Sequence, residues 1–418
     1  MRRLLCVPVV ALLLVGCTWG QLGGTSGRSF DNRYDKALTV SNVNGLVERF
    51  TVSAGTSDLR QPVVGGGLLL TGDRTGLHAF RATGCSGNGV PSCAAVWNVA
   101  GPFWDPVTDG NHVFVADKSG AVLHAFDLNG VQRWTYTIPS VANRTSTFGS
   151  WLTLAGGDVW APVIDADGVT ADVGRIVRLS AGGCGNATCG STLTIPTTSG
   201  VQAVSVDDGR VFVTMAGVLN AFSSATGTLQ WQSSASSAVA GTAVVRDGIV
   251  ITRQISGGHS DPAYVFSAAP GATCTGSPLR CGPIAHFELR GSLFLVISEH
   301  HVAWPGNVDA GPLLWVDKDI ATACAPPGDC FGSAATSLPG VGFPGGGVVA
   351  AAGGVMYLGV LNHIAAIDES APTNCATKCN QLWSATLANS VQGIAIVGGF
   401  VYLTESDGLI HAYGLPPT

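Results

Sequence analysis

The sequence predicts an all-β protein built as a closed ring of short sheets, because three observations agree. One apolar motif recurs along the chain at intervals of 43 to 53 residues. A β-run, a tight turn and a second β-run precede each copy, and most of the turns are Asp-Gly or Gly-Gly, which adopt positive φ readily. No segment shows the period of an amphipathic helix. Repeats of this length and kind indicate a β-propeller.

The recurring motif places an apolar residue at its fourth position, which we take as the anchor of each unit. The eight anchors are Phe80, Phe126, Leu179, Phe222, Phe266, Val316, Ile367 and Tyr413. A strand with a tryptophan follows several anchors, at Trp97, Trp134, Trp231 and Trp383. Each unit is therefore predicted to hold four strands, with the anchor on the third and the tryptophan on the fourth. Such a sheet cannot bury both faces alone, so we expect the tryptophans to pack between neighbouring blades.

The two ends of the repeat region predict how the ring closes. The last unit ends at Thr418, after its anchor strand and without a fourth strand. The apolar run at residues 46–52 can supply the missing strand. Residues 44–418 are therefore expected to form an eight-bladed propeller of four-stranded antiparallel blades, closed by an N-terminal strand. Seven blades remain the alternative if one unit is misassigned.

Two of the units carry a resemblance to a known family. Residues 219–231 (LNAFSSATGTLQW) and 123–134 (LHAFDLNGVQRW) resemble the PQQ-like repeat of quinoproteins. The resemblance implies two functions. One is a noncatalytic, lipid-anchored scaffold similar to the lipoprotein that assists β-barrel assembly in the outer membrane. The other is a dehydrogenase that uses pyrroloquinoline quinone (PQQ) and calcium. The sequence lacks the adjacent cysteine pair of many such enzymes, and no calcium ligand set can be matched residue by residue.

The N-terminus is predicted to be a lipoprotein export signal. Residues 1–16 hold two arginines followed by a short apolar run, and Leu14-Val15-Gly16-Cys17 resembles the bacterial lipobox. Cys17 is then the acylated first residue of the mature chain. An ordinary signal peptide with a chance cysteine and a short hydrophobic anchor are the alternatives. Residues 17–43 are rich in Gly, Ser, Asn and Thr and are expected to form a flexible tether. The expected location is the cell envelope, outside the cytoplasm, on a membrane.

Charge and cysteine content narrow the partners and the compartment. The net charge is −6 without a basic run, so we expect no nucleic acid partner, and the chain is expected to be a monomer. Five local cysteine pairs lie between anchor and outer strands, and in an exported protein they predict disulfides. The pairs are Cys85 with Cys93, Cys184 with Cys189, Cys274 with Cys281, Cys324 with Cys330, and Cys375 with Cys379. Metal binding through these cysteines is the alternative.

Three long predicted loops suggest where a binding face lies. Residues 162–174, 254–262 and 298–312 are predicted to connect second and third strands, which places them on one face of the ring. Their candidate binding residues are His259, Asp261, Glu299, His300, His301, Trp304 and Asp309. Asp165, Asp167 and Asp172 weakly resemble a calcium loop. The competing interpretation is that these side chains are simply solvated.

The sequence holds no known signature of hydrolysis. Neither Gly-x-Ser-x-Gly nor His-Glu-x-x-His occurs in it. We therefore expect a noncatalytic envelope lipoprotein that binds a protein partner without a cofactor. The alternatives are the PQQ-dependent dehydrogenase and a propeller that binds a small ligand or metal.

Overall fold

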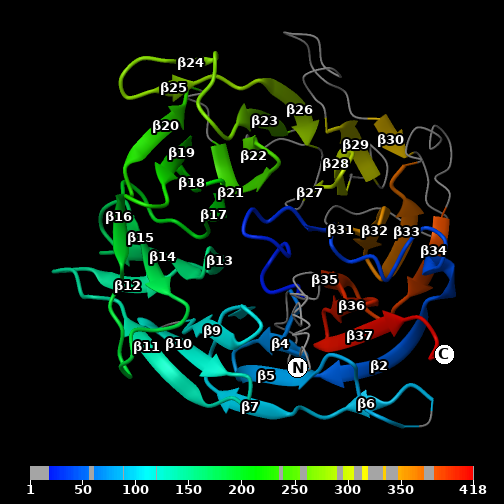
Figure 1. Cartoon of the computed structure of the whole chain (residues 1–418). Helices are drawn as coiled ribbons and strands as arrows, with labels where there is room; N and C mark the ends of the chain where they lie inside the picture. Colours follow the sequence, from blue (N-terminus) through cyan, green and yellow to red (C-terminus); the bar gives the residue numbers. More distant parts are fainter. Residues whose placement is uncertain are drawn as a thin grey trace, which may run out of the picture.

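We describe the protein from a computed structural model. It describes residues 18–55, 61–87, 89–118, 120–234, 239–254, 261–289, 295–305, 313–318, 333–335, 347–370 and 381–417. Over these residues the regular structure is β-sheet, apart from one short 3-10 helix, η1 (Val43–Gly45). The sheets surround a centre, and the chain passes around the ring from β4 through β14 and β22 to β36 (Figure 1). The predicted all-β propeller is confirmed.

Every described sheet is built on a core of four mainly antiparallel strands. The first consists of β3 (Val63–Gly65), β4 (Leu68–Gly72), β5 (Gly76–Arg81) and β7 (Trp97–Ala100). The second consists of β8 (Val107–Thr108), β9 (His112–Ala116), β10 (Val122–Asp127) and β11 (Gln132–Thr137). The third consists of β13 (Thr153–Ala155), β14 (Asp158–Ala166), β15 (Val173–Ser180) and β16 (Leu193–Thr197), with β12 (Thr145–Phe148) beside β14. The fourth consists of β17 (Ser205–Asp207), β18 (Arg210–Met215), β19 (Val218–Ser223) and β20 (Leu229–Ser233).

The second half of the chain repeats the pattern. The fifth sheet consists of β21 (Val239–Arg246), β22 (Ile249–Gln254), β23 (Asp261–Ser267) and β26 (Ala285–Leu289). The sixth consists of β27 (Val296–Ile297), β28 (His301–Pro305), β29 (Leu313–Asp317) and β30 (Ser333–Ala335). The seventh consists of β31 (Gly347–Ala352), β32 (Val355–Val360), β33 (His363–Asp368) and β34 (Gln381–Thr386). The eighth consists of β35 (Val391–Val397), β36 (Phe400–Glu405), β37 (Leu409–Gly414) and β2 (Val47–Ser53).

The predicted anchors and tryptophans lie where the repeat places them. Each anchor lies in the third strand of its sheet, and all eight are buried. The indole N–H of Trp97 donates to the carbonyl of Leu128 (2.8 Å), and that of Trp231 donates to Ala268 (3.1 Å). Both acceptors belong to the following sheet, because they lie between its third and fourth strands. The tryptophans therefore join neighbouring sheets, as predicted.

The N-terminal strand closes the ring. β2 pairs antiparallel with β37, with Val47 opposite Gly414 and Ser53 opposite Leu409. The indole N–H of Trp383 donates to the carbonyl of Leu46 (3.0 Å), which ties the seventh sheet to the start of this strand. The predicted closure by residues 46–52 is confirmed, with boundaries one residue later.

Three of the five predicted disulfides are present, at Cys85–Cys93, Cys184–Cys189 and Cys274–Cys281. The other two predicted pairs lie outside the described residues and stay predictions: Cys324 with Cys330, and Cys375 with Cys379.

Each disulfide loop reaches the outer edge of the preceding sheet, which the sequence did not suggest. β6 (Ser92–Cys93) pairs with β2 of the eighth sheet. β25 (Arg280–Cys281), which pairs with β24 (Cys274–Thr275), adds to β20 of the fourth sheet. Thr188 bridges to Thr135 of β11 in the second sheet. These loops therefore cap open sheet edges.

The two faces of the ring differ in their connections. The tight-turn face carries the turns between first and second strands, such as Gly66-Gly67, Asp109-Gly110 and Gly353-Gly354. The open face carries the loops between second and third strands and the connections from one sheet to the next. Tight turns suit the first face because both residues of Gly66-Gly67 and Gly353-Gly354 have positive φ.

The predicted flexible tether is wrong for residues 18–43. Residues 19–32, which we call the inner belt, lie in the centre of the ring and contact the innermost strand of every described sheet in chain order (Figure 1). The partners, in pairs, are Trp19 with Val64, Gly20 with Thr108, Gln21 with Leu154, Ser26 with Val206, Gly27 with Val245, Ser29 with Ile297, Phe30 with Ala351 and Asn32 with Ile396. β1 (Asp31–Asn32) also pairs parallel with β31.

The glycines of the inner belt allow close packing of the backbone rather than flexibility. A Cβ atom on Gly20 would lie 2.3 Å from the carbonyl oxygen of Thr108, and one on Gly27 would lie 2.0 Å from that of Val245. Only glycine lets the two backbones approach closely enough for these hydrogen bonds. The same composition that is typical of a linker therefore serves close packing here.

Candidate functional site

The structure separates the predicted binding residues rather than bringing them together. His301 and Trp304 lie within β28, where they are 8% and 1% exposed, and Trp304 stacks on Phe287 with ring centroids 4.8 Å apart. The sequence analysis placed them in an open-face loop, because it ended the second strand of this sheet before residue 298. The apolar run of β28 is the second strand, and its buried pattern explains the tryptophan as core.

The remaining members of that set also lie apart. Glu299 and His300 are exposed in the turn between β27 and β28, which belongs to the tight-turn face. The backbone N–H of His300 donates to Glu369 of the next sheet (3.0 Å). Asp261 is the first residue of β23, on the open face. His259 and Asp309 lie outside the described residues. A single site containing all seven residues is therefore not formed.

Two of the three carboxylates of the predicted calcium loop are already engaged. Asp165 is buried and lies 3.2 Å from the guanidinium of Arg175, and Asp167 lies 3.0 Å from that of Arg144. Hydrogen bonds from Thr170 and Val169 hold the pKa of Asp167 well below its usual range. The carbonyl of Asp172 accepts from Gly200. Across the described residues, no three metal-binding side chains come together. The calcium hypothesis stays an untested prediction that this geometry does not favour.

A cavity in the centre of the ring is the strongest candidate site that the described residues offer. Its volume is about 410 Å³, and its lining includes Gln61, Asp105, Trp151, Thr242 and Gln392. Four of them lie at or just before the beginning of the innermost strands of their sheets, and Thr242 lies within β21, the innermost strand of the fifth sheet. The cavity therefore opens on the open face, and we call it the cup.

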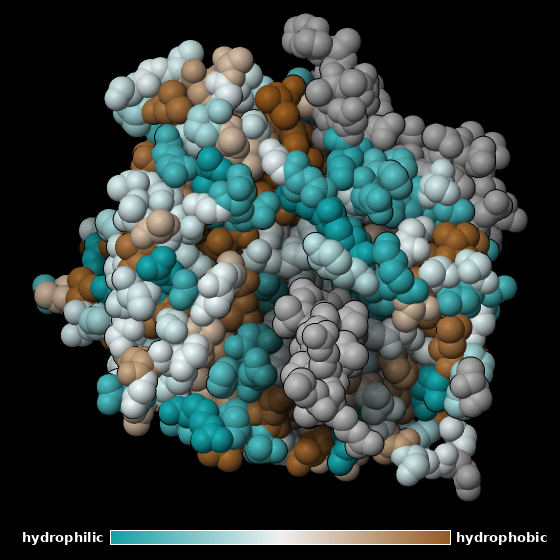
Figure 2. Space-filling model, viewed as in Figure 1, coloured by the Kyte–Doolittle hydropathy of each residue, from teal (hydrophilic) through white to brown (hydrophobic). Residues whose placement is uncertain are grey.

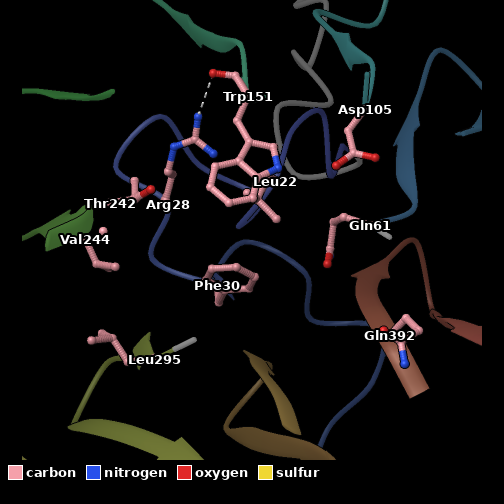
Figure 3. A pocket seen from close by; sticks show the side chains of 11 residues that line it. Leu22, Arg28, Phe30, Gln61, Asp105, Trp151, Thr242, Val244, Leu295 and Gln392 are labelled. Carbon is pink, nitrogen blue, oxygen red and sulfur yellow. Dashed lines mark hydrogen bonds between the residues drawn. The ribbon is translucent and has the colours of Figure 1, made fainter. Parts of the chain in front are cut away.

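The inner belt forms the closed end of the cup. Leu22, Arg28 and Phe30 belong to its lining, while Val244 and Leu295 supply apolar wall from the fifth and sixth sheets. Figure 3 shows Phe30 near the centre of the lining, between Val244 and Leu295 on one side and Gln61 and Gln392 on the other. The cup is thus apolar at its base and polar along part of its wall.

Arg28 fixes the base of the cup to the ring. It is 2% exposed, and its Nε and Nη2 donate to the carbonyls of Val204 (3.0 Å) and Leu152 (3.1 Å) and to the hydroxyl of Thr153 (2.8 Å). Its guanidinium carbon lies 6.0 Å from the ring centroid of Trp151 (Figure 3). Burial lowers the pKa of Arg28 to about 9, so the group stays charged at neutral pH, and Asp105 offsets part of this effect.

The lining of the cup combines apolar and polar side chains. Its described lining holds no serine, cysteine or histidine that could act as a nucleophile or as a base beside one. An apolar base with a few polar groups around it is typical of a site for an amphipathic ligand or a partner side chain. Sequence reasoning missed the cup, although Trp19, Leu22, Phe30 and the charged Arg28 were unusual residues for a tether.

Comparisons with known proteins agree on the fold. Residues 156–271 match the family model described as outer membrane protein assembly factor BamB. No curated protein matches the chain. Among solved structures, BamB from Moraxella catarrhalis is similar with a TM-score of 0.55 and 14% identity, over 88% of this chain and 99% of that one. A quinohemoprotein alcohol dehydrogenase from Pseudomonas putida gives 0.60 and 12% identity, over 96% and 81%. The computationally designed Ika8 protein gives 0.61 and 13%, over 88% and 100%.

These likenesses and the disulfides indicate an extracytoplasmic protein. In the described part of the chain, no helix reaches the length and apolarity of a membrane span. The predicted signal at residues 1–16 and the lipid site Cys17 lie outside the described residues. From its repeats, fold and family match, the chain is a β-propeller of the PQQ-like type that resembles the BamB family.

Proposed function

We propose that this protein is a noncatalytic lipoprotein of the cell envelope, anchored at Cys17, that binds a protein partner through the cup and the surrounding open face. The observation that carries the proposal is the cup itself. The chain uses its own N-terminal residues to close the channel at one end, and the other end is left as a cavity of about 410 Å³. The match to a family described as an assembly factor supports a scaffold.

The lining of the cup suggests what part of a partner would enter it. Phe30, Val244 and Leu295 offer apolar contact, and Gln61 and Gln392 offer amide groups near them (Figure 3). A partner loop that ends in one large apolar side chain would bury it at the base. Its backbone would then meet the polar groups of the wall. Binding energy concentrated in one such anchor is typical of protein interfaces.

The dehydrogenase alternative finds less support in this lining. The resemblance implies a quinone held with calcium, and calcium takes about six to eight oxygen ligands, several of them carboxylates. The described lining of the cup has one carboxylate, Asp105, whose charge interacts with Arg28. The described residues therefore do not fit the quinone and its calcium ion, and no catalytic step is proposed through them.

The test fills the cup. Thr242 is partly exposed on its wall, so Thr242→Trp should occupy the space without disturbing the sheet core. Thr226→Trp, on the exposed turn between β19 and β20, is the matched control. Both are compared with wild type by chemical crosslinking in intact cells, followed by affinity capture and mass spectrometry.

We expect one stoichiometric envelope protein that is lost in Thr242→Trp and kept in Thr226→Trp. A partner that survives in both variants would refute the cup as the binding site. The absence of a specific partner in wild type would refute the scaffold. A rise in melting temperature with PQQ and calcium, abolished by Thr242→Trp, would instead support the dehydrogenase-like alternative.

We also infer that the ring has eight blades rather than seven. Supporting this, the described strands fall into eight sheets, and each carries one of the eight predicted anchors in its third strand. An experimental structure with seven sheets around the channel would contradict the inference.

A further inference from the structure

The chain enters the ring at the tight-turn face. Trp19 is fully buried, and its backbone exchanges hydrogen bonds with Val64 of β3 in both directions, at 2.7 and 2.9 Å. A Cβ atom on Gly110, in the turn between β8 and β9, would lie 3.9 Å from Cγ2 of Thr18. Thr18 therefore lies beside the tight turns of the first two sheets.

This entry point fixes where a lipid anchor would emerge. One residue spans about 3.8 Å, so an acylated Cys17 must lie within that distance of Thr18. The inner belt cannot lengthen to serve as a tether, because it is hydrogen-bonded to every described sheet. Acyl chains on Cys17 would thus leave the molecule directly at the tight-turn face.

Exposed apolar side chains gather at the same end of the molecule. Among the described residues, nine large hydrophobic side chains are exposed. Eight of the nine lie on the tight-turn side: in residues 33–46, which follow the inner belt and which we call the strap, in loops between third and fourth strands, or at the beginning of fourth strands. These eight are Tyr34, Val40, Val47, Val90, Val96, Val131, Leu229 and Ile284. Only Val169 lies on the open face.

The strap itself carries groups suited to a lipid interface. Residues 33–46 pass over the tight turns of the seventh and eighth sheets, where a Cβ on Gly353 would lie 2.0 Å from the carbonyl oxygen of Leu38. Tyr34 is 70% exposed on this strap, and Lys36 is exposed near it. Tyrosine and lysine are favoured at the boundary between lipid and water, because each has an apolar body and a polar tip.

The charges of the face select the kind of lipid. Several carboxylates lie in or directly beside its turns: Asp109, Asp158, Asp208, Asp247 and Glu299. Arg33 and Lys318 pair with Asp247, at 2.7 and 2.8 Å, rather than standing free. Asp158 and Asp208 are likewise paired, with Arg178 and Arg210, at 3.7 and 3.0 Å. A strongly anionic surface would be repelled by carboxylates such as Asp109 and Glu299, whereas a zwitterionic one would not. Hydrophilic and hydrophobic residues are interspersed on the face seen in Figure 2, without one broad apolar area among the coloured residues.

We propose that the tight-turn face lies against a lipid surface of zwitterionic headgroups, and that the open face with its cup points away from the membrane. The proposal rests on the lipid anchor of the proposed function. It gives the scaffold an orientation: Cys17 holds the ring by one face, and partners reach the cup from the aqueous side.

The test compares two exposed valines at opposite faces. Val131 is 53% exposed in the turn between β10 and β11 on the tight-turn side, and Val169 is 90% exposed in the loop between β14 and β15 on the open side. Val131→Cys and Val169→Cys are each labelled with an environment-sensitive fluorophore in the full-length lipidated protein. Both are placed on phosphatidylethanolamine/phosphatidylcholine vesicles that carry a headgroup quencher. Mass spectrometry of the N-terminal peptide establishes acylation of Cys17 separately.

We expect the Val131→Cys label to lose most of its fluorescence and the Val169→Cys label to keep it. Insertion of about 12 Gly and Ser residues between Cys17 and Thr18, a tether of about 20 Å, should restore much of the signal at position 131. Equal quenching at both positions in acylated protein would overturn the orientation and leave the anchor intact. An unacylated Cys17 would overturn the anchor and, with it, the orientation.

Discussion

The centre and the rim of this ring are held together in opposite ways. At the centre, one non-repeating segment of 14 residues, the inner belt, is hydrogen-bonded to every described sheet in turn. At the rim, separate disulfide loops each join one sheet to the edge of the preceding one. The belt is one continuous segment that contacts the sheets through hydrogen bonds. Each cap is a separate loop that is closed by a disulfide bond and contacts one sheet edge.

The difference shows where cooperativity should reside. A loss at the rim exposes one sheet edge, because each cap touches a single neighbour. A loss at the centre removes the contact that all sheets share and opens the base of the cup. Substitutions in the inner belt should therefore destabilise the whole ring, and substitutions in the caps should act locally.

The largest expected effect comes from the buried ion pair that holds the end of the belt. Arg246 of β21 lies 2.7 Å from Asp31, and the two side chains are 8% and 4% exposed. Arg246→Met should lower the free energy of unfolding by about 3–5 kcal/mol, because it removes the buried partner of Asp31 together with the hydrogen bonds that Arg246 donates to the Ser29 hydroxyl and to the carbonyls of Asp31 and Ile297. Arg133→Met is the control, since the Arg133–Asp127 pair is exposed on the arginine side and should contribute less than about 1 kcal/mol. Denaturant unfolding measures both, and equal losses would contradict a special role for the belt.

The same pair predicts a pH dependence. Burial raises the pKa of Asp31 to about 7, although Arg246 partly offsets this. The folded state then holds a proton that the unfolded state releases near pH 4, so stability from this group is complete below that pH and is lost as the pH rises through 7. Asp31→Asn should flatten the fall in melting temperature between about pH 4 and pH 7. If the melting temperature of Asp31→Asn falls with pH as steeply as that of wild type, the pH dependence belongs to another titrating group.

A smaller effect is expected from a methyl group inserted between belt and ring. Gly27→Ala places a Cβ 2.0 Å from the carbonyl oxygen of Val245, so the backbones must separate, at a cost of about 1–3 kcal/mol. Gly190→Ala is the matched control, because nothing lies within 4 Å of its Cβ. The melting temperature should fall only for Gly27→Ala. If the two variants melt alike, the belt does not pack as described.

The disulfide caps should give a smaller and local effect. Replacement of Cys85 and Cys93 together by serine should cost about 2 kcal/mol from the loss of loop closure. It should also raise amide hydrogen exchange at Thr51 of β2, whose N–H donates to Pro91 within that loop (2.9 Å). Replacement of Cys184 and Cys189 should act instead at Thr135 of β11, whose N–H donates to Ala187 (2.9 Å). Faster exchange confined to the loop's own sheet would show that the caps do not protect their neighbours.

The smallest prediction concerns the two cysteine pairs outside the described residues. Cys324 with Cys330, and Cys375 with Cys379, occupy the same place in their units as the three disulfides, between anchor and outer strands. Thiol titration of unreduced, denatured mature protein should therefore find no free thiol. Free thiols in these pairs would leave metal binding open and would restrict the capping pattern to part of the rim.

Much of the fold could be predicted because short stretches of the sequence specify it. The anchors, the tight turns, the tryptophan strands and the closing strand follow from a period of about 47 residues and from alternating apolar residues within it. Disulfide pairing was predictable because the partners lie 5 to 8 residues apart in the described pairs. His301 and Trp304 were misplaced because the sixth unit departs from the repeat, and a strand containing His, Trp and Pro resembled a loop.

The sequence by itself determined the repeat, the order of strands within each sheet and the way the last sheet is completed. Only the tertiary structure decided that residues 19–32 line the ring, that the cup exists and that each described disulfide loop caps its neighbour. The physical reason is that these contacts join residues from different units. The channel that receives Trp19, Arg28 and Phe30 exists only after the sheets have closed around it, and no local pattern in the chain specifies its width.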